Sequence, residues 1–135
     1  MERISPEMRK HACHLILSIM KEIKATKEFH IGEETPWEEV GEGLKRQMMG
    51  YDDKIMLVKV DFKVGAVGQM HKHHHSQVTY VESGEFEMTI GEEIRILKGG
   101  DAFYIPPFVM HGCVCKKDGV LIDVFSPARE DFLEQ

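Results

Sequence analysis

Short runs of β-forming residues, separated by turn signals, make up most of the sequence after Leu44. The runs are rich in Val, Ile, Phe and Tyr. The turn signals between them are Gly50-Tyr51-Asp52-Asp53, Gly65 to Gly68, Ser83-Gly84, Gly91-Glu92 and Gly99-Gly100. This spacing predicts an all-β sandwich or barrel. The predicted strands cover residues 45–49, 55–63, 69–73, 77–82, 85–90, 93–97, 102–105, 111–116 and 120–125.

The beginning of the chain follows the pattern of an amphipathic α-helix instead. Ser5, Pro6 and Glu7 suit an N-cap and a first helical turn. Apolar residues then recur with a 3.6-residue period from Met8 to Ile23, with lysines off the stripe, which predicts a helix over residues 6–27. We expect it to pack on the protein's own sheet or on a second subunit rather than on an anionic membrane. This divides the chain into an N-terminal helical extension, residues 1–30, and a single domain, residues 31–135.

An acidic, glycine-rich segment joins the two parts. It runs from Gly32 to Gly43, and its composition predicts a loop or linker. We expect Trp37, inside this segment, to anchor it against the core.

Composition limits the partners and the compartment of the protein. A chain of 135 residues is long enough for one domain with a sizeable apolar core. With 17 basic and 23 acidic residues the formal net charge is −6, and no basic run is dense enough to favour nucleic acid. No apolar stretch approaches the roughly 20 residues that span a bilayer, so a membrane partner is not expected. Three cysteines and no secretory start favour reduced thiols in the cytoplasm.

Histidines recur at every second position just before the middle of the predicted sheet. Alternate side chains of an extended strand point to the same face. The residues that should line one wall in this way are His71, His73, His75 and Gln77. A curved sheet can bring the distant His111 to the same place from its other wall. Imidazole suits zinc, copper, iron or nickel, so the pattern predicts a site for one divalent metal ion.

The same stretch resembles the first motif of the cupin superfamily. That motif is a glycine, five residues, His-x-His, three residues, an acid, six residues and a glycine. Residues 65–84, GAVGQMHKHHHSQVTYVESG, match it with Gln77 in place of the acid. Residues 100–111, GDAFYIPPFVMH, match the second motif with Phe108 in place of a glycine, and Cys115 stands where an asparagine often follows. The resemblance implies the cupin fold, a jelly-roll barrel or double-stranded β-helix, over about residues 40–127.

A closer resemblance is to the KdgF family of pectin-degradation cupins. It is carried by LKRQMMGYDDKIMLVKVDF, VGQMHKHHHSQVTYVESGEFEMTIGEE and GVLIDVFSPAREDF. That family converts cyclic 4,5-unsaturated uronates, released by pectate and alginate lyases, to open-chain keto forms. The resemblance implies a metal-dependent enzyme with a small anionic sugar as substrate and one divalent ion (Ni, Zn, Mn, Co or Fe) as cofactor. The implied metal ligands are His71, His73, Gln77 and His111. The implied catalytic residues, by an Asp-x-Phe-x-x-x-Arg spacing, are Asp123, Phe125 and Arg129.

The chemistry of these residues suits such a reaction. Three imidazoles and one carboxamide are neutral, so a bound ion keeps its full +2 charge and can polarise a bound oxygen. Asp123 shares a strand face with Leu121 and Phe125, and this apolar setting favours a raised pKa and an acid/base role. Phe125 would supply an apolar wall for the sugar ring. Arg129 can take a carboxylate in two parallel hydrogen bonds. Two other interpretations stay open: Asp123 as a strand-end residue paired with a basic neighbour, and Arg129 as a surface arginine.

Three other side chains have open roles around this site. His75 faces inward by alternation, but the motif has no ligand there, so we expect it to support the site or line the pocket. Cys113 and Cys115 share the parity of His111, which raises a zinc site with sulfur ligands as an alternative. Alternate side chains along a strand spread over about 14 Å, too far for all three to reach one ion. One of the two cysteines could instead line the pocket.

Two further functions compete with ring opening. One is an iron(II) cupin dioxygenase acting on a small organic substrate, and the other is a non-catalytic sugar-binding or sensory module. An oxygenase should require oxygen and iron, whereas ring opening should need no oxygen. Exposed sheet edges favour association, and we expect a homodimer.

Overall fold

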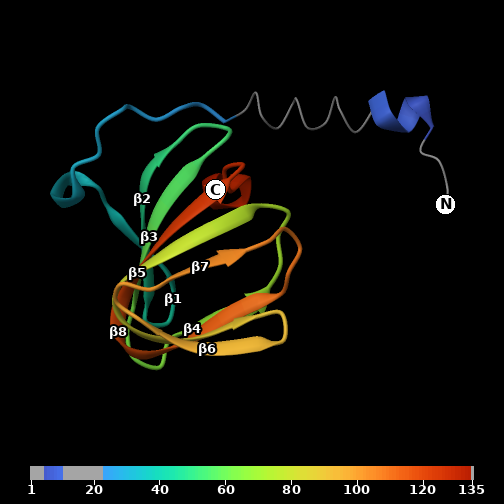
Figure 1. Cartoon of the computed structure of the whole chain (residues 1–135). Coiled ribbons are helices and arrows are strands. Elements are labelled where there is room, and N and C mark those ends of the chain that lie inside the picture. The colour runs from blue at the N-terminus through green and yellow to red at the C-terminus, as the bar shows by residue number, and fades with distance from the viewer. Residues whose placement is uncertain (1–4, 11–22, 135) are drawn as a thin grey trace.

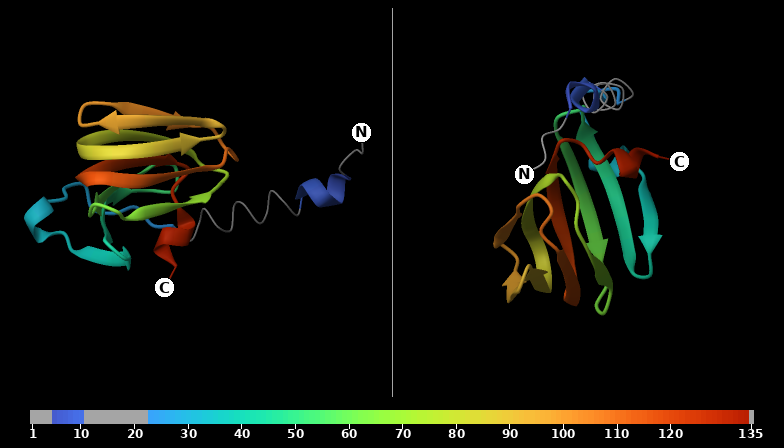
Figure 2. Two further views of the ribbon diagram at one scale, coloured as in Figure 1. Left: turned by 90° about the horizontal axis from the view of Figure 1, so that it is seen from below. Right: turned by 90° about the vertical axis from the view of Figure 1, so that its right-hand side faces the viewer.

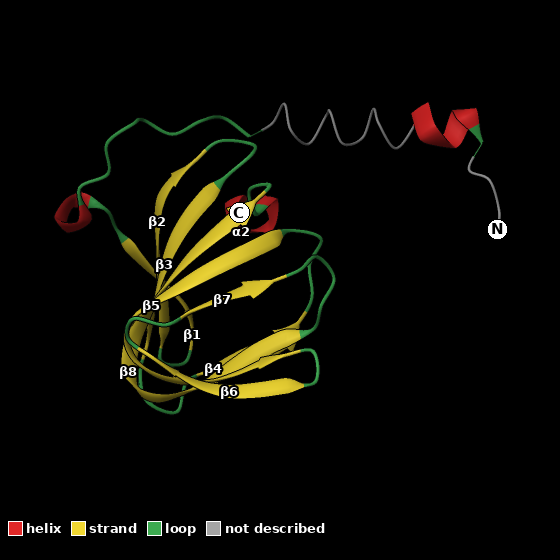
Figure 3. Ribbon diagram, in the orientation of Figure 1, coloured by secondary structure: helices red, strands yellow, loops and turns green. Residues whose placement is uncertain are grey.

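The computed structural model describes residues 5–10 and 23–134 and has the predicted all-β fold, as Figures 1 and 3 show. The strands are β1 (Trp37–Gly41), β2 (Leu44–Tyr51), β3 (Met56–Phe62), β4 (Val67–His71), β5 (Ser76–Ile90), β6 (Glu93–Lys98), β7 (Ala102–Ile105) and β8 (His111–Ser126). Two short helical turns, η1 (Gly32–Glu34) and α2 (Glu130–Leu133), lie before β1 and after β8.

Two long strands, β5 and β8, pair with each other along both halves of the barrel (Figure 2). In one half, the start of β5 and the end of β8 lie between β7 and β3, and the sheet continues to β2 and β1. In the other half, the end of β5 and the start of β8 lie between β6 and β4. The two halves thus share their central strands, which gives the jelly-roll barrel that the sequence implied.

The sheet folds over where Gly84 on β5 passes Gly119 on β8. Gly84 has a φ of 86°, and the pairing register shifts on both sides of it. A Cβ atom added to Gly119 would lie 2.1 Å from the carbonyl oxygen of Ser83 and 2.6 Å from the Cα atom of Gly84. The predicted breaks between residues 82 and 85 and between 116 and 120 are therefore wrong. Both are bends inside one continuous strand, because bulges and glycines let a strand cross from one sheet to the other.

Alternation along β5 and β8 points one face of each strand into the barrel. On β5, Val78 and Tyr80 are about half exposed, whereas the residues between and beside them are buried. On β8, the predicted inward face of Leu121, Asp123 and Phe125 is confirmed by their burial. Apolar residues fill two clusters in the interior. The register places the buried pair of Thr79 and Asp123 between these clusters, so a polar site lies within an apolar barrel.

The N-terminal helix is shorter at its C-terminal end than the sequence predicts. Residues 6–10 are helical, and the hydroxyl of Ser5 accepts the N–H of Met8 (3.1 Å), as the N-cap prediction requires. Residues 11–22 lie outside the described part of the chain, and residues 23–27 are not helical. There, the N–H of Thr26 bonds the carbonyl of Tyr51 (3.0 Å), which ties this segment to the end of β2. The division of the chain at residue 30 stays a prediction. None of the described helices is long and apolar enough to cross a membrane.

The segment predicted as a loop before the barrel contains η1 and the edge strand β1. Trp37 is 36% exposed and lies below the ammonium group of Lys45, 5.0 Å from the ring centroid. The expectation that Trp37 anchors the core is therefore wrong. An edge strand with both faces exposed has no alternating pattern, which is why its acidic and glycine content suggested a loop.

We predict that Gly119→Ala lowers the free energy of unfolding by about 2–3 kcal/mol, because the new methyl group meets backbone atoms of β5 that cannot turn aside. Urea denaturation of the metal-free protein measures this. Gly32→Ala is the matched control, since nothing lies within 4 Å of its added Cβ. Equal stability of the two variants would contradict the close strand crossing.

Candidate functional site

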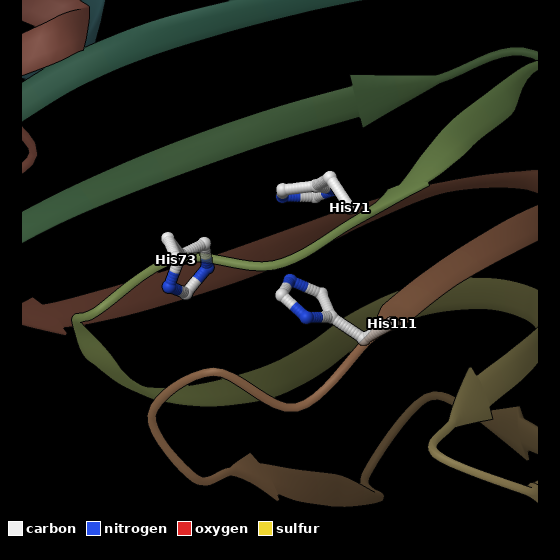
Figure 4. Close-up of side chains that lie close together, drawn as sticks. All are labelled: His71, His73 and His111. Carbon is white, nitrogen blue, oxygen red and sulfur yellow. The ribbon is translucent and has the colours of Figure 1, made fainter.

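Three histidines from three segments converge inside the barrel, as Figure 4 shows. His71 ends β4, His73 lies in the following loop and His111 begins β8. His71 and His111 are paired across the two strands, and their ring centroids are 4.3 Å apart. The rings of His73 and His111 are 4.7 Å apart. One ring nitrogen of each residue lies within 4.8 Å of the other two. Since His71 is exposed and His111 is buried, the cluster extends from the surface into the interior.

Backbone carbonyls fix the orientation of all three rings. The Nδ1 atom of His71 lies 2.7 Å from the carbonyl of Gln69, that of His73 lies 3.1 Å from the carbonyl of His75, and that of His111 lies 2.9 Å from the carbonyl of Val109. A carbonyl only accepts, so each Nδ1 carries the proton and each Nε2 keeps its lone pair. The Nε2 atom of His111 is buried without any hydrogen-bond partner. Ring nitrogens held in this way are typical of metal ligands.

Burial keeps the rings of His73 and His111 neutral. Burial, followed by the charges of Arg129 and His111, lowers the pKa of His73 to about 4. The pKa of His111 is also lowered, mainly by burial. Near neutral pH these imidazoles are unprotonated, which is the state that binds a divalent cation.

Gln77 on β5 completes the set of four neutral donors. Its Nε2 atom donates to the hydroxyl of Thr79 (3.0 Å) and makes a longer contact with the Oδ1 atom of Asp123 (3.4 Å). This turns its Oε1 atom towards the Nε2 atom of His73, 3.1 Å away. Two lone pairs then face each other at a separation close to that of neighbouring ligands around one ion with bonds of about 2.1 Å. The residues present therefore fit a divalent metal ion.

Strand alternation correctly groups His71, His73 and Gln77, but the prediction that one extended strand carries all three is wrong. β4 ends at His71, and residues 72–75 form a loop. His75 does not join the cluster: its Nε2 atom contacts the carboxylate of Glu130 (2.9 Å), and its ring lies edge-on against that of His73 (centroids 5.3 Å apart). The loop is held from the other side by Phe108, whose N–H donates to the carbonyl of His73 (2.8 Å). Phe108 has a φ of 65°, the left-handed conformation that suits the glycine usual at this motif position.

Asp123 lies beside the metal-ligand cluster, inside the barrel. Its Oδ1 atom accepts the hydroxyl of Thr79 at 2.6 Å. Burial raises the pKa of Asp123 to about 6, although Thr79 and Arg129 act in the opposite direction. The alternative of a strand-end residue paired with a basic neighbour is thus not what the structure shows, because the polar side chains that Asp123 contacts are Thr79 and Gln77.

Arg129 follows β8 and is buried, with an exposed fraction of 8%, so the surface alternative is wrong. Its Nε and Nη2 atoms donate to the two carboxylate oxygens of Asp131 (2.9 and 2.7 Å). Its guanidinium group lies 5.0 Å from the ring centroid of Phe125 and 4.1 Å from that of Phe132. Both contacts fix the direction of the arginine.

A cavity of about 260 Å³ joins these groups. It is lined by His71, Gln77, His111, Asp123, Phe125 and Arg129. This is below the roughly 300–1,000 Å³ of pockets for drug-sized ligands, which suits a single sugar ring.

Three residues of the site were not predicted from the sequence. Arg46 and Phe132 line the cavity, and the guanidinium group of Arg46 lies 4.2 Å from the ring centroid of Phe132. Thr79 bonds both Gln77 and Asp123. Alternation from Gln77 could have found Thr79, whereas nothing in the local sequence distinguishes Arg46 or Phe132.

The cysteines do not join the metal-ligand cluster. Within the described residues, the groups with metal-ligand spacing contain no cysteine. Cys113 lines the cavity, as expected for one of the pair, and burial raises the pKa of its thiol to about 12. Cys115 is buried in the apolar core, and its thiol donates to the carbonyl of Lys117 (3.0 Å). A neutral thiol is a poor metal ligand, which argues against the sulfur alternative.

Comparison with known proteins places the chain in a family. The cupin domain model matches residues 58–125. The pectin degradation protein KdgF of Dickeya dadantii (strain 3937) is 50% identical over 107 residues, which are 78% of this chain and 97% of that protein. The chain is a cupin of the KdgF family.

Solved structures agree with this assignment. An RmlC-like cupin from Shewanella frigidimarina NCIMB 400 is 50% identical to this cupin, with a TM-score of 0.79 over 81% of this chain and 98% of that one. KdgF from a Halomonas species is 41% identical, with a TM-score of 0.76 over 79% of this chain and 99% of that one.

We predict that this cupin binds one equivalent of a divalent ion and that His111→Ala weakens binding by at least about 100-fold, since loss of even a supporting contact costs 10–100-fold. Titration of chelator-treated protein with Zn²⁺ or Ni²⁺ measures the affinity. His30→Ala, which removes a histidine outside both metal-spaced groups, is the control and should bind as the unaltered protein does. Wild-type affinity in His111→Ala would contradict the site.

Proposed function

We propose that this cupin converts cyclic 4,5-unsaturated monouronates to their linear keto forms. The observation that carries the proposal is one cavity lined by two histidines of the metal-ligand cluster, by Gln77, by the buried carboxyl group of Asp123 and by the buried Arg129. The 50% identity to a pectin degradation protein supports it.

The reaction is a rearrangement without oxidation or reduction. The hydroxyl on C1 loses its proton, the bond between C1 and the ring oxygen breaks, and C1 becomes an aldehyde. The oxygen on C5 is then an enolate, and C5 becomes a ketone when C4 gains the proton that the C1 hydroxyl lost. One group that can accept and return a proton, placed beside the ring, is sufficient.

We assign that proton transfer to Asp123, because its carboxyl group lines the cavity and is the acidic side chain among the lining residues. Phe125 forms an apolar wall next to it. Asp131 occupies the Nε and Nη2 edge of Arg129, so the remaining N–H groups of that guanidinium are the ones we assign to the substrate carboxylate.

His71, His73, Gln77 and His111 are the residues that we propose hold the metal ion. When bound, a divalent ion with neutral ligands polarises a substrate oxygen and attracts an anionic sugar. The donor set accepts Ni, Zn, Mn, Co or Fe, and availability decides among them. We further propose a cytoplasmic location, which the free thiols of Cys113 and Cys115 support, and substrates from alginate as well as pectin, since these differ only in hydroxyl orientation.

The decisive experiment follows the ultraviolet absorbance of freshly made unsaturated monouronate after protein is added. We expect faster loss than in the spontaneous reaction, abolition by chelator, recovery with added divalent ion, and the same rate in air and under nitrogen. Dependence on oxygen would identify a dioxygenase, and no acceleration would leave a sugar-binding module. Either result contradicts ring opening.

We predict that Asp123→Asn lowers kcat by about 10²–10⁴-fold, because the amide cannot take up a proton. Asp61→Asn is the matched control, since Asp61 faces away from the buried side of β3, and its kcat should stay within about twofold. Equal kcat in the two variants would remove Asp123 from the mechanism.

We propose that the protein forms a homodimer. β6 is an edge strand of the sheet, and its Ile94 and Ile96 are 60% and 49% exposed. An exposed apolar edge strand is an aggregation hazard that a second copy can cover.

Light scattering after gel filtration should give twice the chain mass of 15.5 kDa, and Ile96→Lys should shift the protein towards the monomer. Val64→Lys, at an exposed position outside the strands, should leave the dimer intact. A monomeric unaltered protein would refute the proposal.

A further inference from the structure

A second group of ligand-type side chains lies beside the metal-ligand cluster. The two oxygens of the Glu130 carboxylate separately contact the Nε2 atoms of His74 (3.2 Å) and His75 (2.9 Å). The side chain of His75 is almost fully buried, whereas that of His74 is half exposed. These three residues come from the loop of residues 72–75 and from the first position of α2.

The group has metal-ligand spacing, but its hydrogen bonds differ from those of the metal-ligand cluster. There, every Nδ1 atom is held by a backbone carbonyl. Here, the Nδ1 atom of His75 is buried without a hydrogen-bond partner among the described residues, so no backbone carbonyl fixes that ring. Its Nε2 atom already has the Glu130 carboxylate as a partner. The arrangement is that of a clamp made by one carboxylate on two imidazoles.

The clamp is connected to a proposed metal ligand by one residue. His75 contacts Glu130 with its ring and accepts the Nδ1 proton of His73 with its carbonyl (3.1 Å). The ring direction of His73 thus depends on where His75 lies. The N–H of Phe108 also holds this part of the loop, because it donates to the carbonyl of His73 (2.8 Å). Together these contacts leave the His73 ring little freedom.

The other end of the clamp lies in the segment that carries Arg129. α2 has four residues, and the side chain of its N-cap residue, Arg129, makes no capping hydrogen bond to the helix backbone. The packing of Phe132 on Phe125 (centroids 5.7 Å apart) and the contacts of Glu130 hold α2 against the barrel.

We infer that Glu130 is a positioning residue, whose carboxylate clamps the His73 loop to the C-terminal segment and so prepares the metal site. The inference rests on the metal site of the proposed function.

The test compares Glu130→Gln with Glu134→Gln, the same change on an exposed glutamate after α2. The glutamine keeps the size of Glu130 but has one acceptor oxygen, so only one imidazole can be held. Binding of Zn²⁺ to metal-free protein is measured against a chromophoric chelator. We expect one equivalent in every protein, with about 10–100-fold weaker binding in Glu130→Gln and unchanged binding in Glu134→Gln.

Two further measurements separate positioning from a structural role. The melting temperature of metal-free Glu130→Gln shows whether the fold is intact, because a merely structural residue would lower it and leave the Zn²⁺ affinity unchanged. His74→Ala removes only the exposed half of the clamp, so this variant should fold and bind Zn²⁺ more weakly than the unaltered protein but more tightly than Glu130→Gln.

Unchanged Zn²⁺ affinity in Glu130→Gln would overturn the inference. So would two equivalents of Zn²⁺ in the unaltered protein and one in Glu130→Gln, because the second group would then itself be a metal site. The readout uses no sugar. A protein that shows the Zn²⁺ effect but does not open unsaturated uronates would therefore contradict the proposed function and leave this inference standing.

Discussion

The antiparallel pairing of β5 with β8 sets the positions of both the core and the candidate site. Its register pairs Gln77 with Phe125 and Thr79 with Asp123 in one half of the barrel, and Ile90 with His111 in the other. The close passage of Gly84 and Gly119 allows both strands to bend together, so one pair of strands serves two facing halves. Gln77, Thr79, His111, Asp123 and Phe125 therefore lie on the long strand pair at the centre of the sheet, which keeps these side chains of the site in place.

Charge distribution around the cavity favours an anionic ligand in spite of the net charge of −6. Arg129 is held by two hydrogen bonds to Asp131, which offset much of its charge while fixing its direction. An ion bound by three imidazoles and the Gln77 carboxamide keeps both positive charges, because no ligand neutralises it. The proposed metal is then the main attraction for a uronate, and the arginine mainly orients it. We therefore expect glutamine instead of glutamate at position 77 to strengthen the attraction of the proposed site for an anionic substrate.

Sequence patterns were most reliable where a strand is long and has one buried face. Alternation placed Leu121, Asp123 and Phe125 on the inner side of β8, as the structure confirms. It grouped His71 and His73 correctly but for the wrong reason, since a loop and not a strand carries His73. Glycine occurs both at bends inside a strand and at turns between strands. The sequence prediction therefore divided each of the continuous strands β5 and β8 into two. Arg46 reaches the cavity because the sheet is curved, and the spacing of residues along the chain does not predict that curvature.

We propose that four atoms meet on one cation: the Nε2 atoms of His71, His73 and His111 and the Oε1 atom of Gln77. Anomalous X-ray scattering from crystals of metal-loaded protein, recorded at the absorption edge of the metal, tests it most directly. We expect one strong peak about 2.1 Å from the three nitrogen atoms, with the Gln77 oxygen also in bonding range. A peak elsewhere, such as beside Glu130 and His75, with none between the three histidines, would contradict it.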